Sequence, residues 1–167
     1  EVIKINREAK SVTVKELNTG REYEETYDKL VLSPGAGPII PPLPGVDLPG
    51  VFTLRNIPDM DKIKSFVDQK KPARAVVVGG GFIGLEIAEN LVDRGVEVTL
   101  IEMLNQVMAP IDYEMAALVH QHLIFKRIRL ALGDGLKAIS KSDTEGWLQV
   151  ALSSERKVDT QMVILSI

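Results

Sequence analysis

The first 33 residues alternate apolar and polar side chains over short stretches. Alternation with a period of two is typical of strands that have one buried face and one wet face. Asn18-Thr19-Gly20 is a turn signal between two of these stretches. We therefore expect four short strands in this region, at Ile3–Ile5, Val12–Val14, 21–27 and 29–32.

Residues 34–50 hold six of the nine prolines of the chain and four of its glycines. Proline fixes φ and lacks a backbone donor, so neither a helix nor a central strand is expected to pass through this segment. We interpret it as a stiff connector between two domains, because structureless loops of this length are uncommon inside compact domains. A long surface loop within one domain is the alternative.

From residue 51 onward, helical patterns alternate with buried strand patterns. Asn56 can cap a helix that runs to about Gln69, with Pro58 in its first turn. The β-branched run from Ala75 to Val78 is typical of a parallel strand buried on both faces, and residues 96–101 predict a second one. The other expected elements are a helix that ends at Gly95, a helix from Asp112 to about Lys126, a strand at 128–132, and short strands at 136–140, 147–152 and 160–167.

These elements predict an α/β fold, with a Rossmann-like parallel sheet, flanking helices and an antiparallel β-meander. A simple dehydrogenase would instead continue the alternation of strand and helix to a six-stranded sheet. On the helix over 112–126, the side chains expected on or near one face are Met115, Leu118, Val119, His122 and Leu123.

A glycine motif follows the strand at 75–78 and fits G-x-G-x-x-G at Gly79, Gly81 and Gly84. The first glycine permits the sharp turn into the helix, the second lets a pyrophosphate approach backbone N–H groups, and the third lets helix and strand pack closely. Glu102 lies 18 residues past the last glycine, where it is placed to accept hydrogen bonds from the adenosine ribose. The surrounding strand, helix and acid favour a dinucleotide site over a structural turn.

The residues after the second strand bear on which nucleotide is bound. Glu102 favours NAD over NADP, because the 2′-phosphate of NADP would face a like charge. Met103 stands where NADP enzymes often place arginine and indicates the same preference.

The composition is that of an ordinary globular protein, with 45% hydrophobic residues, 26% charged residues and a formal net charge of −3. It gives no support for nucleic-acid or anionic-membrane partners, which favour clustered lysine and arginine. No apolar run approaches the roughly 20 residues that span a bilayer, and no signal-peptide pattern is present. We therefore expect a cytoplasmic location.

Cysteine is absent, which excludes disulfides, a thiolate nucleophile and cysteine metal sites among these residues. The only histidines, His120 and His122, lie two apart on an expected helix, where their side chains diverge. We expect them to pack at the surface or half-buried, without binding a metal.

Four stretches of the chain carry a family resemblance: YDKLVLSPGAGPIIPPLPG at 27–45, VFTLRNIPDMDKI at 51–63, VVVGGGFIGLEIAENL at 76–91 and LGDG at 132–135. Together they resemble the FAD-dependent pyridine nucleotide–disulfide oxidoreductases. They are most similar to the branch with coenzyme A-disulfide reductases, NADH oxidases and NADH-dependent persulfide reductases. The resemblance implies that hydride passes from NADH to the flavin N5, and that electrons then pass to a disulfide, a persulfide or oxygen.

The resemblance also implies roles for individual residues. Phe82 matches an aromatic near the nicotinamide–flavin stack, and Glu86 matches an acid that reaches toward the nicotinamide carboxamide or a lysine beside the flavin. Packing at the helix start, and an exposed acid favoured by the helix dipole, are the alternatives for these two residues. The cofactor-binding residues expected in total are Gly79, Gly80, Gly81, Phe82, Ile83, Gly84, Glu86, Glu102 and Met103 for NAD(H), and Ser33, Pro34 and Gly35 for FAD.

The same resemblance implies a division of the chain. Residues 1–33 match part of an FAD-binding domain, 34–50 the connector, 51–160 the NAD(H)-binding domain, and 161–167 a final strand that leads back toward the FAD domain. Both ends look cut, as in a fragment, because the chain begins with Glu1 rather than Met and stops at Ile167 within an apolar run. It also has only one glycine fingerprint and no redox cysteine. We expect the parent to be a homodimer, and this chain alone to bind NADH weakly and reduce nothing.

The chain departs from the family pattern at two places, and two other functions remain as alternatives. Residues 124–127 lack the glycine-containing turn that this branch usually has there, and Ser33-Pro34-Gly35 stands where many relatives have Ala-Thr-Gly. A plain NAD-dependent dehydrogenase is one alternative, but it would need a catalytic histidine, a Tyr-Lys pair or a metal. A non-enzymatic NAD-sensing domain is the other.

Overall fold

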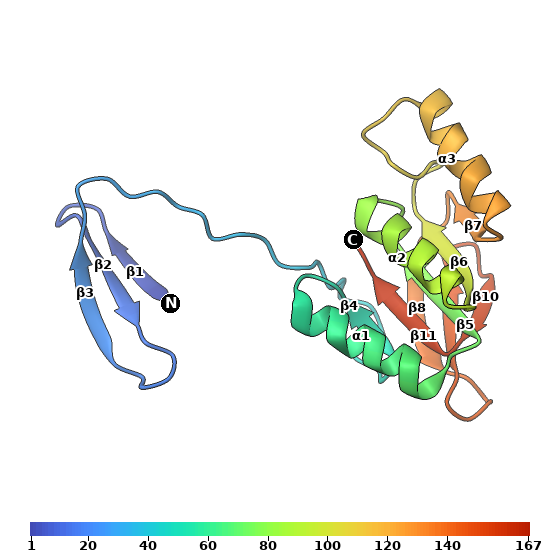
Figure 1. Cartoon of the computed structure of the whole chain (residues 1–167), viewed down its shortest axis with the longest axis horizontal. Coiled ribbons are helices and arrows are strands. Elements are labelled where there is room, and N and C mark those ends of the chain that lie inside the picture. Colours follow the sequence, from blue (N-terminus) through green and yellow to red (C-terminus); the bar gives the residue numbers. More distant parts are fainter. The chain divides into compact units, whose positions relative to one another are not determined.

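The structure, a computed structural model, describes residues 1–167, which form two compact units (Figure 1). The small unit covers Glu1–Ala36 and the large unit covers Gly37–Ile167. The division falls inside the proline-rich segment 34–50, which contains no helix or strand, as predicted. Its last part belongs to the large unit, where the carbonyl oxygen of Pro44 accepts a hydrogen bond from the backbone N–H of Ile139 at 2.8 Å.

The small unit is an antiparallel sheet with the strand order β1-β2-β3. Its strands are β1 (Val2–Asn6), β2 (Ser11–Lys15) and β3 (Glu22–Thr26). The turn before β3 places Gly20 at a φ of 72°, in agreement with the turn signal. The expected buried face is not covered within the small unit, because this unit is a single three-stranded layer: every residue of β1 and β3 is exposed.

A fourth strand at 29–32 was predicted and is wrong. These residues pair with no strand, and Val31 is 85% exposed. An apolar β-branched run becomes a strand only when its backbone N–H and C=O groups find a neighbouring strand, and none is present here.

The large unit contains a five-stranded parallel sheet. In spatial order its strands are β4 (Val51–Thr53), β11 (Met162–Leu165), β5 (Arg74–Val78), β6 (Glu97–Glu102) and β7 (Arg129–Leu132). The expected second and third parallel strands, β6 and β7, are confirmed.

The last strand lies inside the parallel sheet. β11 pairs with β4 on one side and β5 on the other and is buried along its whole length. That residues 161–167 lead back toward an FAD domain stays a prediction. The stretch 160–167 is not one strand, because it holds the end of β10 (Lys157–Thr160) and all of β11. A fully apolar tetrad such as Met162–Leu165 is buried at the centre of a sheet, covered on both faces.

Two layers cover the parallel sheet, and they give the predicted α/β fold (Figure 1). Helices α1 (Ile57–Lys70), α2 (Phe82–Asp93) and α3 (Tyr113–Phe125) pack on one face, where Ala75 and Val77 of β5 point. The antiparallel sheet β8-β9-β10 packs on the other face, where Val76 and Val78 point. Its strands β8 and β9 are Leu136–Lys141 and Leu148–Leu152.

The ends of the helices follow the sequence in part. Asn56 caps α1, and its Oδ1 accepts a hydrogen bond from the backbone N–H of Asp59 at 3.0 Å, as predicted. Gly95 follows α2 with a left-handed φ of 81°. Asp112 occupies the N-cap position of α3, but its side chain makes no capping hydrogen bond, so the predicted cap is wrong in its chemistry.

The buried face of α3 also differs from the prediction. Ala116 and Leu123 are buried, whereas Met115 is 57% and Leu118 is 58% exposed. Helix α3 lies over the edge strand β7, so only a narrow stripe of it meets the sheet. None of the three helices combines the length and the apolar character that a bilayer span requires.

Candidate functional site

The turn between β5 and α2 brings the glycine motif to the carboxyl ends of the parallel strands. Gly79 has a φ of 108°, and a Cβ there would lie 2.5 Å from the carbonyl oxygen of Ser166. A Cβ on Gly84 would lie 1.9 Å from the carbonyl oxygen of Gly79. Both positions therefore require glycine because the protein's own backbone fills the space.

Gly81 differs from these two glycines. A Cβ on Gly81 would meet no atom within 4 Å, and its φ of −81° is one that any residue can adopt. The chain itself gives no reason for glycine here. The space beside Gly81 is open to a ligand, which fits the close approach of a pyrophosphate to the backbone.

The first turn of α2 presents free backbone donors beside that space. The N–H groups of Phe82, Ile83 and Gly84 have no partner within the helix, and no side chain caps it. The positive end of the helix dipole lies at the same point. Free N–H groups with a favourable dipole form an anion site.

Glu102 lies next to this turn at the end of β6, as predicted. Its Oε2 accepts a hydrogen bond from the N–H of Gly80 at 2.7 Å, and its Oε1 accepts one from the N–H of Leu104 at 2.8 Å. Each carboxylate oxygen keeps a further lone pair with which to accept a hydroxyl. The sequence indicated the carboxylate but not that it also braces the glycine turn against the following loop.

The loop after β6 closes the other side of the glycine turn. The N–H of Met108 donates to the carbonyl oxygen of Gly80 at 2.8 Å, and Val107 beside it is fully buried. The N–H of Val107 donates to Nε2 of His120 at 3.1 Å. His120 thus holds this loop on α3, a role that the sequence did not indicate because the two residues are 13 positions apart.

The histidines otherwise match the prediction. His120 is half-buried, with its ring edge against Tyr113, and His122 lies at the surface with Nε2 at 2.6 Å from Oε1 of Glu89. No group of three or more histidine, aspartate or glutamate side chains is arranged to hold a metal.

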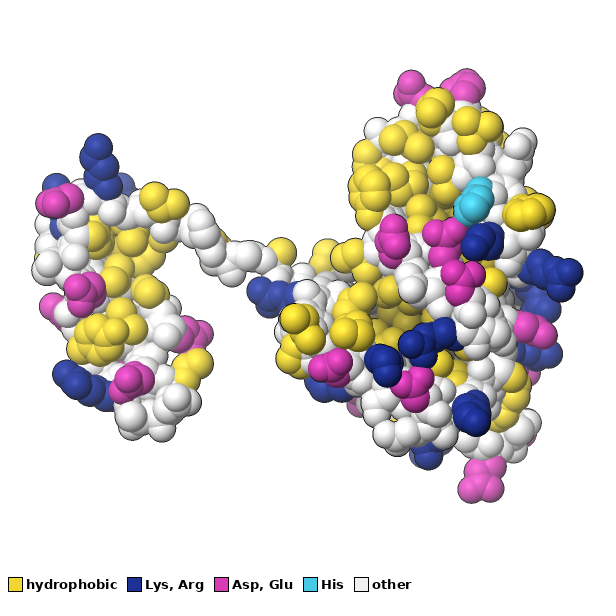
Figure 2. Space-filling view, viewed as in Figure 1, with side chains coloured by type: hydrophobic (Ala, Val, Ile, Leu, Met, Phe, Trp, Pro, Cys, Tyr) yellow, Lys and Arg dark blue, Asp and Glu magenta, His cyan; other side chains and the backbone are white.

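Phe82 and Glu86 lie on a groove between α1 and α2. The groove has a volume of about 450 Å³, and Phe82 is 70% exposed. Figure 2 shows hydrophobic side chains gathered in this hollow, with charged side chains at its rim. Its apolar lining comes from Leu54, Met60, Ile63, Val67, Phe82, Ile83, Ile87 and Leu91.

The predicted NAD(H)-binding residues outside the glycines thus lie at two places in the large unit. Phe82, Ile83 and Glu86 lie along the groove, whereas Glu102 and the 74% exposed Met103 lie at the end of β6. The predicted FAD contacts at 33–35 belong to the small unit, where all three residues are exposed.

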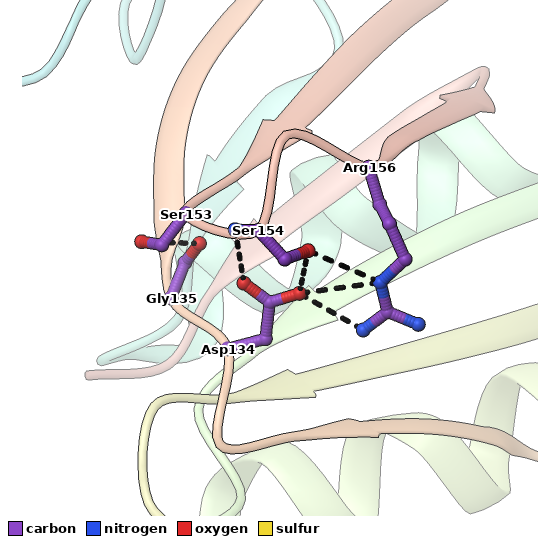
Figure 3. Close-up of polar contacts among 5 residues, drawn as sticks. All are labelled: Asp134, Gly135, Ser153, Ser154 and Arg156. Atoms are coloured by element: carbon purple, nitrogen blue, oxygen red, sulfur yellow. Dashed lines mark hydrogen bonds and ion pairs between the residues drawn. The ribbon is translucent and has the colours of Figure 1, made fainter.

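Asp134 is a further residue near the site that the sequence did not single out. It belongs to the LGDG stretch and is only 4% exposed, and its carboxylate contacts Ser154 and Arg156 (Figure 3). The Ser154 hydroxyl, together with the Arg156 guanidinium, holds the pKa of this carboxyl below its ordinary value.

Comparison with known proteins gives matches over the whole chain. The family model described as pyridine nucleotide-disulphide oxidoreductase matches residues 1–167. A coenzyme A disulfide reductase of Staphylococcus haemolyticus is 40% identical over 139 residues, which is 83% of this chain and 31% of that protein.

Two solved structures are similar in both sequence and fold. Reduced CoADR-RHD of Bacillus anthracis is 51% identical with a TM-score of 0.90, covering 100% of this chain and 29% of that one. The water-forming NADH oxidase of Lactobacillus brevis, bound to NADH, is 32% identical with a TM-score of 0.88, covering 100% of this chain and 36% of that one. The chain spans about a third of the length of the relatives it matches.

Proposed function

Because the chain belongs to the pyridine nucleotide-disulphide oxidoreductase family, we propose that it is the NAD(H)-binding part of a flavin-dependent oxidoreductase. The single observation that carries this proposal is the open space beside Gly81, next to the free N–H groups of α2, with the Glu102 carboxylate bonded to the adjacent Gly80. These groups fit a pyrophosphate and a ribose, which are the two recognisable parts of the adenosine half of NAD(H).

In this proposal each predicted residue has a defined task. The backbone of Gly80, Gly81, Ile83 and Gly84 surrounds the pyrophosphate, and Glu102 accepts hydrogen bonds from the ribose hydroxyls. Met103 contributes no positive charge to a 2′-phosphate, which favours NADH over NADPH. Phe82 and Glu86, on the apolar groove, face the nicotinamide half, where Phe82 excludes water and Glu86 orients the carboxamide or a neighbouring lysine.

The redox chemistry belongs to the cofactors. A bound FAD would supply the site that takes hydride from NADH and the route for electrons to the final acceptor. The 167 residues contain no cysteine, so they supply no thiol that could carry electrons from the flavin to that acceptor. We expect this chain alone to bind NADH and to reduce nothing.

The small unit fits a piece of a flavin-binding domain. Its exposed apolar side chains, including Val2, Ile3 and Ile5, form a sheet face that needs a second layer, and residues 33–35 would touch FAD at its edge. We propose a homodimeric, cytoplasmic parent enzyme.

The acceptor is proposed from the relatives. The names of the matched proteins, coenzyme A disulfide reductase and NADH oxidase, favour a small-molecule disulfide or oxygen, and the sequence resemblance adds a persulfide. No observation favours a plain dehydrogenase, because Nε2 of His120 is engaged by the N–H of Val107.

Substitution of Gly81 by alanine tests the proposal. The added methyl group meets no protein atom, so the melting temperature should stay that of the wild type. The same methyl group would block the pyrophosphate, so the affinity for NADH, measured by fluorescence titration of the purified chain, should fall by about tenfold or more.

Gly84→Ala is the matched comparison, because its methyl group would collide with the Gly79 carbonyl and should lower stability by about 1–3 kcal/mol or more. A Gly81→Ala chain that binds NADH as tightly as the wild type would contradict the proposed site. A wild-type chain that does not bind NADH at all would contradict the proposed function.

A further inference from the structure

Asp134 is the one ionisable side chain that the protein buries. It lies in the loop between β7 and β8, and its carboxylate accepts four hydrogen bonds (Figure 3). Oδ1 accepts from the Ser154 N–H at 3.0 Å, and Oδ2 accepts from the Ser154 hydroxyl at 2.6 Å and from Nη2 and Nε of Arg156 at 2.9 and 3.3 Å. A buried charge is retained only where such partners satisfy it.

The backbone of the same loop is bound to the end of β6. The N–H of Asp134 donates to the carbonyl oxygen of Glu102 at 3.1 Å, and the N–H of Gly133 donates to that of Leu104 at 2.8 Å. Gly135 lies against Met103, since a Cβ on Gly135 would be 3.7 Å from Cγ of Met103. The carboxylate of Asp134 therefore anchors a loop that holds residues 102–104 from both ends.

These contacts form one continuous hydrogen-bond path into the cofactor site. It runs from Arg156 and Ser154 through Asp134 to the backbone of Glu102, whose carboxylate then reaches the N–H of Gly80. The distance between the backbone of Glu102 and the glycine turn decides whether this carboxylate can accept hydrogen bonds from the Gly80 N–H and from a ribose hydroxyl at the same time.

We propose that Asp134, held by Ser154 and Arg156, is a positioning residue for the ribose-binding carboxylate of Glu102. The inference rests on the proposed NAD(H) site and identifies what determines its geometry. Asp134 does not touch the nucleotide. It fixes residues 102–104, so that Glu102 presents its free lone pairs to the ribose hydroxyls.

The test is a double-mutant cycle on the full 167-residue chain. Asp134→Asn, Glu102→Gln and the double variant are titrated with NADH and with ADP-ribose, which carries the adenosine ribose and pyrophosphate without nicotinamide. Each single variant should bind both ligands about tenfold more weakly, the effect of losing one hydrogen bond to a charged group. Because Asp134 acts through Glu102, the double variant should bind no more weakly than Glu102→Gln alone.

Amide hydrogen exchange of the ligand-free chain provides a second readout. The N–H groups of Gly80 and Leu104 are bonded to the Glu102 carboxylate, so they should exchange faster in Asp134→Asn, whereas the core N–H of Val77 should not change. Asp159→Asn is the matched control, because Asp159 is exposed on β10 and contacts only Gln149 at 3.2 Å. It should alter neither binding nor exchange at these amides.

The outcomes separate the two proposals. Additive effects in the cycle, or unchanged exchange at Gly80 and Leu104, would overturn the positioning role. If the wild-type chain fails to bind either ligand, the proposed function is wrong, and the exchange data still decide the role of Asp134. If Asp134→Asn does not fold, Ser154→Ala is tested by the same two measurements; it removes the 2.6 Å hydroxyl bond to Asp134 and the 3.2 Å bond that the hydroxyl accepts from Nε of Arg156, and it leaves the other three bonds to the carboxylate.

Discussion

Arg127 adopts a left-handed backbone conformation, with a φ of 63°, just after the end of α3. An L-residue with a side chain is strained there by roughly 1–2 kcal/mol, which is why glycine is common at this position. Arg127→Gly should relieve this strain. Glycine also adds conformational entropy to the unfolded chain, which offsets about 0.4–1 kcal/mol of this gain. The free energy of unfolding, measured in urea, should therefore rise by about 0.5–1 kcal/mol.

The neighbouring residue gives the control for that substitution. Lys126 has a φ of −72°, so glycine relieves no strain there, and Lys126→Gly should lower the free energy of unfolding by about 0.5–1 kcal/mol. Equal changes for both variants would mean that the left-handed conformation of Arg127 costs nothing.

Single residues were predictable where their reason is local. The tasks of Gly79 and Gly84 follow from the strand–turn–helix pattern, and the structure shows the backbone contacts that demand them. The contacts of Asp134 were not predictable, because its partner Ser154 lies 20 residues away and the LGDG stretch does not indicate which residue its aspartate contacts. The hydrogen bond that His120 accepts from Val107 was not predicted for the same reason, since a half-buried histidine acceptor has no sequence signature.

At the scale of elements, the N-caps of α1 and α3 form a natural comparison. Asn56 makes a side-chain capping hydrogen bond, whereas Asp112, in the equivalent position, makes none. Asn56→Ala should therefore lower the free energy of unfolding by about 1 kcal/mol, and Asp112→Ala by much less. Chemical denaturation of both variants checks this, and an equal loss would show that the cap bond of Asn56 is not what stabilises α1.

Asp68 pairs with Lys64 on α1 itself and with Arg94 at the end of α2, both at 2.7 Å, and the second pair joins the two helices. These two partners, Lys64 first, lower the pKa of Asp68 from its ordinary 3.8. A lowered carboxyl pKa contributes stability that is present above the unfolded-state pKa and is lost as the pH falls through the folded-state pKa. Asp68→Asn should therefore destabilise the chain at neutral pH, and the difference from the wild type should vanish in strong acid.

Urea denaturation across a pH series measures this difference. Asp61→Asn, on the same helix, is the control, because Asp61 is exposed and has no ion-pair partner. A difference between wild type and Asp68→Asn that persists unchanged into strong acid would contradict the role of the ion pairs.

Elements were predictable where their signals lie within them. The cap, the proline and the apolar period of α1 are all contained in one stretch of sequence, and so are the glycine turn and α2. Pairing between strands is not local. The pairing of β11 with β4 and β5 was therefore not predicted from the sequence, and a strand was predicted at 29–32 that has no neighbour.

At the scale of the whole molecule, all residues of both main hydrophobic clusters belong to the large unit. A chain of residues 37–167 should therefore fold by itself, melt within about 2 °C of the full chain and bind NADH with the same dissociation constant. Calorimetric melting and fluorescence titration of the two chains check this. A large fall in melting temperature would show that the small unit stabilises the large one.

The place of β11 has a consequence for how the protein is made. Residues 162–165 follow every other strand of the parallel sheet in the sequence but lie beside β5, and the backbone N–H of Ser166 donates to the carbonyl oxygen of Val78 at 2.8 Å, next to the glycine turn. While the nascent chain is still on the ribosome, β5 lacks its neighbour and the turn lacks its support. The nucleotide site thus cannot form in stages during synthesis, and it is complete only when β11 has left the exit tunnel.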